Sequence, residues 1–129
     1  MPESVKNRPT TATEEIFLLT KSPTYFYDPD GFRERTGANL RNYWILGPEP
    51  NGNGHPAAFP RELARRCIQL GSRPEDIILD PFGGSGTTGV AASELGRSAI
   101  LIELNPEYAE ASRARSQTIQ PMLRTANFT

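Results

Sequence analysis

The chain has 129 residues, with 14 Lys or Arg and 15 Asp or Glu, so its formal net charge is -1. This composition excludes a collagen, a strongly charged disordered tail and a basic nucleic-acid coat protein. No apolar run approaches the roughly 18 residues of a membrane helix, and the first ten residues lack the apolar core of a signal peptide. We therefore expect a cytoplasmic protein without a membrane partner.

A single Cys and a single His exclude an internal disulfide and a cysteine-based zinc site, and we predict no metal. Eight of the 12 prolines lie in residues 1–60. This uneven distribution predicts an irregular first half joined to a regular α/β second half.

The first half offers few regular elements. Residues 14–20 (EEIFLLT) predict a strand buried on both faces, because the apolar run does not alternate with polar residues. Residues 25–27 either extend this strand or return as a hairpin. Residues 28–58 are rich in Pro, Gly, Asn and Asp and predict a long loop, in which 40–46 form a short strand.

The second half begins with a helix. Pro60 suits its first turn and Gly71 its end, and Cys67 lies on the apolar face as a predicted core thiol. Further along, 76–80 and 98–103 predict buried strands, and Asn105 caps a last helix that runs to about Gln120. A helix ending near Leu95, with Gly96 as its stop, lies between the strands. This order predicts a βαβ unit with a parallel sheet.

A glycine-rich turn separates the first of these strands from its helix. Gly84-Ser85-Gly86-Thr87-Thr88-Gly89 matches G-x-G-x-x-G in the strand–turn–helix setting that makes this pattern informative. Glu103 ends the next strand, where a carboxylate accepts hydrogen bonds from the ribose hydroxyls of an adenosine. The pattern therefore predicts an adenosine-containing ligand, with a tight turn beside a helix-capping acid as the purely structural alternative.

The residues beside the glycines narrow the choice of ligand. No Gly-Lys-Ser/Thr follows, which excludes a P-loop. A nicotinamide fold usually runs a plain hydrophobic strand into its glycines, whereas here Asp80-Pro81-Phe82 precede Gly83. A nicotinamide-dependent oxidoreductase therefore remains as the less favoured alternative.

DPFGGSGTTG (80–89) resembles the S-adenosylmethionine loop of the DNA amino-methyltransferases, which methylate the exocyclic nitrogen of adenine or cytosine. HPAAFP (55–60) and ILIELNPEYAEASRAR (100–115) are similar to the family's cofactor-enclosing and ribose-binding segments, and residues 8–28 to its late catalytic-domain strand region. Thr13 replaces the family's usual His. Phe59 stands where many adenine methylases carry Lys, a form associated with cytosine-N4 enzymes.

The resemblance implies an incomplete α/β, Rossmann-like methyltransferase fold, because the motif order is that of the permuted class whose catalytic motif comes first. The expected parts are the strand region (1–27), a loop over the target-recognition interval (28–54), the cofactor-binding βαβ unit (55–120) and a tail (121–129). The residues expected to bind S-adenosyl-L-methionine are His55, Pro56, Phe59, Pro60, Asp80, Pro81, Phe82, Gly83, Gly84, Ser85, Gly86, Thr87, Thr88, Glu103 and Leu104.

The family's catalytic motif, Asp/Asn/Ser-Pro-Pro-Tyr/Phe/Trp, has no intact copy in these residues. Ser22-Pro23-Thr24-Tyr25 differs from it by one residue, but its neighbours match the late strand segment, so we assign it no catalytic role. We expect the chain to be the C-terminal part of a DNA methyltransferase and inactive alone. The alternative is a non-catalytic or split subunit that needs a complementing N-terminal half or forms a homo-oligomer.

DNA is the expected partner, and a few basic residues of the loop are its expected phosphate contacts. These are Arg33, Arg35 and Arg41.

Overall fold

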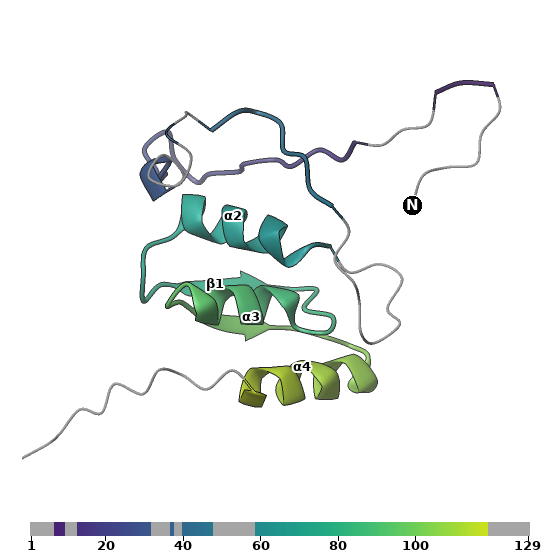
Figure 1. Cartoon of the computed structure of the whole chain (residues 1–129). Coiled ribbons are helices and arrows are strands. Elements are labelled where there is room, and N and C mark those ends of the chain that lie inside the picture. The colour runs from purple at the N-terminus through teal and green to yellow at the C-terminus, as the bar shows by residue number, and fades with distance from the viewer. Residues whose placement is uncertain (1–6, 10–12, 32–36, 38–39, 48–58, 119–129) are drawn as a thin grey trace, which may run out of the picture.

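The computed structural model describes residues 7–9, 13–31, 37, 40–47 and 59–118. The elements follow one another as α2 (Arg61–Gly71), β1 (Ile77–Asp80), α3 (Thr87–Glu94), β2 (Ser98–Leu101) and α4 (Pro106–Thr118). The two strands are parallel, with Ile77 opposite Ser98 and Asp80 opposite Leu101. Helix α3 lies against the sheet, and α2 and α4 contact α3 from either side (Figure 1). The predicted α/β class and parallel βαβ unit are therefore confirmed.

The hydrophobic core lies between α2, α3 and β1. Ala64 and Ile68 of α2 pack against Ala91 and Ala92 of α3, and the two α3 alanines are completely buried. Ile78 of β1 packs against this cluster from the sheet. Alanine side chains thus form most of the contact between the two helices.

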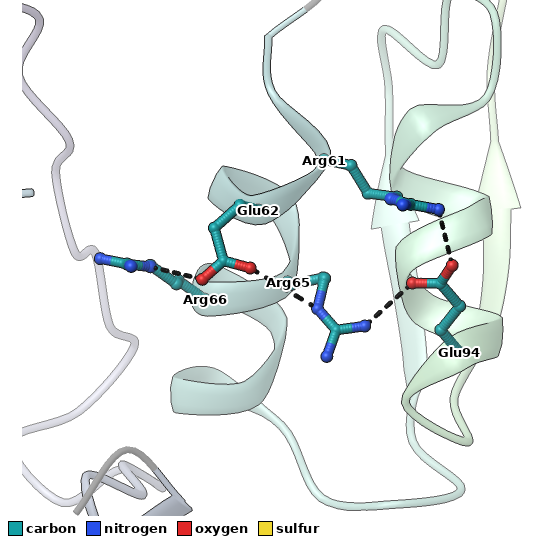
Figure 2. A network of polar contacts seen from close by, with 5 residues as sticks. All are labelled: Arg61, Glu62, Arg65, Arg66 and Glu94. Carbon is teal, nitrogen blue, oxygen red and sulfur yellow. Dashed lines mark hydrogen bonds and ion pairs between the residues drawn. The ribbon is translucent and has the colours of Figure 1, made fainter. Parts of the chain in front are cut away.

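An ionic network on the surface joins α2 to the last turn of α3 (Figure 2). The carboxylate of Glu94 accepts one bond from Arg61 (Nη1···Oε1, 2.8 Å) and another from Arg65 (Nη1···Oε2, 2.9 Å). Within α2, Glu62 pairs with Arg66 at 2.9 Å and with Arg65 at 3.7 Å. Exposed ion pairs contribute about 0–1 kcal/mol each, so this network adds little to the stability of the fold.

The end of α3 and the start of α4 have the capping interactions that the sequence predicts. Gly96 adopts a left-handed conformation (φ 74°) after α3, and its N–H and that of Arg97 donate to the carbonyls of Ser93 (3.0 Å) and Ala92 (2.8 Å). This pair of bonds is the Schellman motif. Before α4, the side chain of Asn105 accepts a bond from the Glu107 N–H at 2.9 Å, which confirms the predicted N-cap.

The strands predicted for the first half are absent. Residues 14–20, 25–27 and 40–46 contain no strand. The apolar residues of the first segment are exposed, with Phe17 at 74% and Leu19 at 88%. A strand exists only when a neighbour pairs with its backbone groups, and within the described residues no strand lies beside these segments. The prediction of a buried strand over this apolar run was therefore wrong.

Part of the first half instead covers the outer side of α2 (Figure 1). The Asp28 N–H donates to the carbonyl of Leu70 at 2.9 Å. The guanidinium of Arg73 lies 4.4 Å from the ring centroid of Phe26, and that of Arg66 lies 5.5 Å from the Trp44 ring. Such cation–π contacts attach the segment to the helix without a sheet.

The strands of the sheet are at most partly buried on one face and are exposed on the other, so the prediction of strands buried on both faces was wrong. Ile78 and Leu101 point toward α3, whereas Ile77 and Ile100 are 66% and 53% exposed on the opposite face. Strand side chains alternate between the faces, and the helices contact the side that carries Ile78. Among the described residues, no helix is long and apolar enough to span a membrane.

Candidate functional site

Asp80 organises the turn between β1 and α3. Its Oδ1 accepts a bond from the Phe82 N–H at 2.9 Å, and its Oδ2 accepts one from the Thr88 hydroxyl at 2.6 Å. The carboxylate thus bridges the first turn of the loop and the first turn of the helix. Because both oxygens have protein partners, we infer that Asp80 shapes the loop from within.

The glycines of the turn are required by the chain's own packing as well as by its backbone conformation. Gly84 and Gly86 have φ values of 51° and 87°, a region that residues with a Cβ rarely adopt. A Cβ on Gly86 would lie 2.5 Å from the Ser112 Oγ, and one on Gly83 would lie 2.8 Å from the Leu101 Cβ. At Gly84 the nearest atom to such a Cβ is 3.9 Å away, so Gly84 is the glycine of this turn that faces open space.

Glu103 brings a second carboxylate to the same edge of the sheet. Its Oε2 accepts a bond from the Gly84 N–H and its Oε1 one from the Asn105 N–H, both at 2.8 Å. A carboxylate has about four acceptor positions, so two bonds leave capacity for two further donors. The half-buried Glu103 therefore meets the requirement for a vicinal diol while it already holds the loop in place.

Two large, exposed apolar side chains follow the two strands of the sheet. Phe82 follows β1 and Leu104 follows β2, and they are 85% and 95% exposed. The carboxyl ends of parallel strands meet at one edge of a sheet, the edge where open α/β sheets bind ligands. Exposed aromatic and aliphatic surface beside a hydrogen-bonding carboxylate suits a flat, partly polar ring such as a purine.

An apolar groove of about 390 Å³ runs between β1 and α2 and reaches the turn at Asp80 and Thr88. Phe59, Leu63 and Cys67 form its α2 side. Glu103 does not line it, so the groove and the carboxylate are neighbouring features of one edge. Pro60 precedes α2 in an extended conformation, and its carbonyl accepts a bond from the Leu63 N–H at 2.9 Å.

Cys67 is exposed in the groove, so the prediction of a core thiol was wrong. Its apolar surroundings still remove water from the thiol, and this burial raises the pKa of Cys67 above its ordinary value, against a smaller lowering by a backbone hydrogen bond. A thiol with a raised pKa remains protonated near neutral pH and is a poor nucleophile.

Sequence reasoning missed two residues of α4 that support the turn. Arg115 Nη1 donates to the carbonyl oxygen of Ser85 at 3.0 Å and to its Oγ at 3.1 Å. Ser112 is buried against Gly86. The two lie one helical turn apart, so they share a face, but only the packing of α4 against the loop reveals that this face carries Arg115 to Ser85.

The remaining predicted residues divide into two groups. The Ser22 hydroxyl donates to the Thr24 carbonyl at 2.6 Å, and Ser22, Pro23 and Tyr25 are exposed and do not line the groove. Arg41 donates to the Tyr43 hydroxyl at 2.7 Å on the surface. Four others lie outside the described residues: His55, Pro56, Arg33 and Arg35.

The chain matches known proteins along most of its length. The profile of a family described as DNA methylase matches residues 1–114. The type II methyltransferase M.SmaI of Serratia marcescens is 47% identical over 120 residues, which are 88% of this chain and 41% of that protein. The type II methyltransferase M.Cfr9I of Citrobacter freundii is 46% identical over 121 residues, or 91% of this chain and 40% of that protein.

Solved structures agree with this match. The PvuII DNA methyltransferase, described as cytosine-N4-specific, is 30% identical with a TM-score of 0.59, over 81% of this chain and 38% of that one. The complex of M1.HpyAVI with SAM is 31% identical with a TM-score of 0.52, over 71% and 43%. The chain thus spans about 40% of the length of the curated relatives it matches.

Proposed function

Because the chain belongs to the N6/N4 DNA methylase family, we propose that it forms the S-adenosyl-L-methionine-binding part of a DNA methyltransferase. The substrate of the whole enzyme is the exocyclic amine of a DNA base. The cofactor is the family's methyl donor, and the family resemblance of the turn at 80–89 supports its assignment to this edge of the sheet.

The observation that carries the proposal is the contact between Glu103 and Gly84. It joins the carboxylate that follows β2 to the one glycine of the turn that faces open space. A nucleoside bound at this edge would have a carboxylate that accepts bonds from its ribose next to a glycine whose backbone it can approach closely. Neither feature alone indicates a nucleoside, so the inference depends on their combination.

The residues present fit this cofactor. Glu103 would accept the ribose hydroxyls, Phe82 and Leu104 would contact the adenine, and the apolar groove beside Asp80 and Phe59 would enclose the methionine end. The bound cofactor supplies a methyl group on a sulfonium, which the amine nitrogen of the base attacks. In this chain, Asp80 and Arg115 orient the turn, and Glu103 orients the ribose.

Cytosine N4 is the methyl acceptor that we favour over adenine N6. The similarity to the cytosine-N4-specific PvuII enzyme supports this choice, as does Phe59 in the H-P-A-x-F-P segment. Mass spectrometry of nucleosides from DNA methylated by the complete enzyme tests it. We expect N4-methylcytosine, and N6-methyladenine alone would overturn the assignment.

The second candidate is a cofactor-binding subunit that does not itself catalyse transfer. It is favoured by the absence of an Asp/Asn/Ser-Pro-Pro-Tyr/Phe/Trp motif from these 129 residues. A methyl-transfer assay with the purified chain and DNA separates the two candidates from a self-sufficient enzyme. We expect no transfer above background, and measurable turnover would show that Ser22-Pro23-Thr24-Tyr25 replaces the missing motif.

Titration calorimetry tests the cofactor itself. The purified chain should bind S-adenosylhomocysteine and should not bind NAD under the same conditions. Binding of NAD without binding of S-adenosylhomocysteine would overturn the methyltransferase proposal in favour of a nicotinamide-dependent oxidoreductase.

A further inference from the structure

The side chain of Arg97 joins the ends of helices α2 and α3. Arg97 follows the left-handed Gly96, and its own N–H donates to the Ala92 carbonyl at 2.8 Å, so the end of α3 fixes its backbone. Nη1 donates to the Leu95 carbonyl at 2.5 Å. Toward α2, Nη2 donates to the Ser72 carbonyl at 2.7 Å and Nε to the Ser72 Oγ at 3.2 Å. One guanidinium therefore bonds to the residues that follow both helices.

This guanidinium supplies a cation that both helix ends lack. Neither α2 nor α3 has a basic residue in its last turn, although the last carbonyls of a helix carry a partial negative charge that a cation stabilises. The Ser72 hydroxyl extends the link into α2, because it donates to the Ile68 carbonyl at 2.6 Å. Ser72 is buried and Arg97 is half-buried. Hydrogen bonds to a charged group contribute more than exposed ion pairs, so Arg97 is a stronger link between the helices than the surface network.

The apolar contact between the two helices leaves room for such a link to matter. It consists of Ala64 and Ile68 of α2 against Ala91 and Ala92 of α3. Alanine has no side-chain atom beyond Cβ, so three of these four residues offer few interlocking contacts. We therefore expect the bonds of Arg97 to determine how closely the end of α2 lies against α3 and the sheet.

Helix α2 is also one wall of the apolar groove. Leu63 and Cys67 line the groove from α2, and its lining includes Ser72 and Asp80. Ser72 is bonded to Arg97, which precedes β2, whereas Asp80 ends β1. The groove thus extends along β1 from the Arg97 link to the glycine turn. Van der Waals attraction is so short-ranged that a gap of about 0.5–1 Å forfeits roughly a quarter to a half of it. A small displacement of α2 would therefore weaken binding in the groove.

We propose that Arg97 is a positioning residue for the methionine end of the cofactor, although it precedes β2 and Glu103 follows it. Arg97 acts through α2, whose distance from the sheet sets the width of the groove. This inference rests on the proposed function, which assigns the methionine end to the groove and the ribose to Glu103. The two parts of the cofactor then have separate supports, because the adenosine depends on residues that follow β1 and β2.

Titration calorimetry with two ligands tests this separation on the purified chain. S-adenosylhomocysteine carries the amino-acid part, whereas 5′-methylthioadenosine has the same adenosine and thioether without it. Arg97→Met should raise the dissociation constant of S-adenosylhomocysteine roughly tenfold and that of 5′-methylthioadenosine less than about twofold. Arg97→Lys keeps the charge and part of the bonding, so it should restore part of the lost affinity. A merely structural role would weaken both ligands equally.

Arg113→Met is the matched control for the charge. The Arg113 side chain lies on α4, is 70% exposed and pairs with Glu110 at 3.2 Å, so its replacement removes the same charge without touching α2. We expect no change in the affinity for either ligand. Circular dichroism and urea unfolding check the fold of each variant, and Arg97→Lys carries the test if Arg97→Met does not fold.

The thiol of Cys67 provides a readout that needs no ligand, because it is the only cysteine of the chain. Burial raises its pKa, so a wider groove would hydrate the thiol and increase its thiolate fraction. Iodoacetamide should therefore alkylate native Arg97→Met roughly threefold faster than the native wild-type chain at pH 8. Gly86→Ala, which we expect to be less stable with the Arg97 link intact, controls for alkylation through unfolding.

The proposal fails if a folded Arg97→Met variant binds S-adenosylhomocysteine as the wild type does, or loses affinity for both ligands equally. It also fails if Arg113→Met reproduces the effect on binding, or if alkylation of Arg97→Met is no faster than that of Gly86→Ala. These results leave the proposed function intact as long as the wild-type chain binds S-adenosylhomocysteine. A wild-type chain that binds neither ligand refutes the proposed function and the role of Arg97 together.

Discussion

Replacing Glu103 by Gln changes one oxygen of a carboxylate into an amide nitrogen at the point where the turn and β2 meet. Both Glu103 oxygens accept bonds from backbone N–H groups, of Gly84 and of Asn105, at 2.8 Å. A Gln can satisfy one of these amides, but its NH₂ group faces the other donor. The variant therefore loses one protein hydrogen bond together with the negative charge that would accept the ribose hydroxyls.

The magnitude follows from the kind of bond that is lost. Hydrogen bonds to charged groups contribute about 1.5–3 kcal/mol, and ordinary ones about 0.5–1.5 kcal/mol. We expect a loss of roughly 1–3 kcal/mol in the free energy of cofactor binding, which raises the dissociation constant roughly 5- to 160-fold at 25 °C. The broken Gly84 or Asn105 contact should also lower the melting temperature, because the carboxylate is half-buried.

The assay is titration calorimetry with S-adenosylhomocysteine and with its 2′-deoxy analogue, on the wild-type chain and on Glu103→Gln. If the carboxylate accepts the 2′-hydroxyl, removing that hydroxyl weakens binding to the wild type and hardly affects binding to the variant. This double cycle separates a direct contact from a general loosening of the turn. Glu107→Gln serves as the control, because Glu107 is an exposed carboxylate in the first turn of α4.

Unchanged affinity of a folded Glu103→Gln variant would refute the ribose-binding role. Equal and additive losses for the hydroxyl and for the carboxylate would leave Glu103 as a support of the turn only. A comparable loss in Glu107→Gln would attribute the effect to net charge.

Four further outcomes are expected. Gly86→Ala should destabilise the chain by about 1–3 kcal/mol in thermal unfolding, because residue 86 has a left-handed backbone and an added Cβ would clash with Ser112. Gly71→Ala should be neutral, because no atom lies within 4 Å of an added Cβ there. Equal effects of the two substitutions would contradict this reasoning. Arg115→Met should weaken S-adenosylhomocysteine binding a few-fold by releasing Ser85, and unchanged affinity would exclude this supporting role. Glu94→Gln should cost about 0–1 kcal/mol at low salt and less at high salt; a salt-independent loss would be inconsistent with an exposed network. Because burial raises the pKa of Cys67, a smaller fraction of this thiol is ionised at pH 8 in the folded chain than in the urea-unfolded chain. Iodoacetamide should therefore alkylate the folded chain more slowly. Equal rates would refute the shift.

The sequence by itself determined where the helices and the glycine turn of the second half lie. The positions of Pro60 and Asn105 marked the starts of α2 and α4, and Gly96 the end of α3. These signals set the helix ends through φ values and capping bonds within one or two turns of backbone, so they can be recognised without knowledge of the fold. The glycine turn after β1 was legible for the same reason, since left-handed residues require glycine wherever the rest of the chain lies.

The tertiary structure decided what these elements contact. Arg115 lies 30 residues from Ser85, and Glu103 lies 19 residues from Gly84, so no local pattern announces either bond. The run at 14–20 has the composition of a strand. A strand needs a neighbouring strand to pair with, and the described residues provide none for this run. Local preference selects a backbone conformation, whereas hydrogen-bond partners and burial are set by which segments pack together. For that reason the sequence predicted buried strands, and only the fold revealed that one face of the sheet is bare.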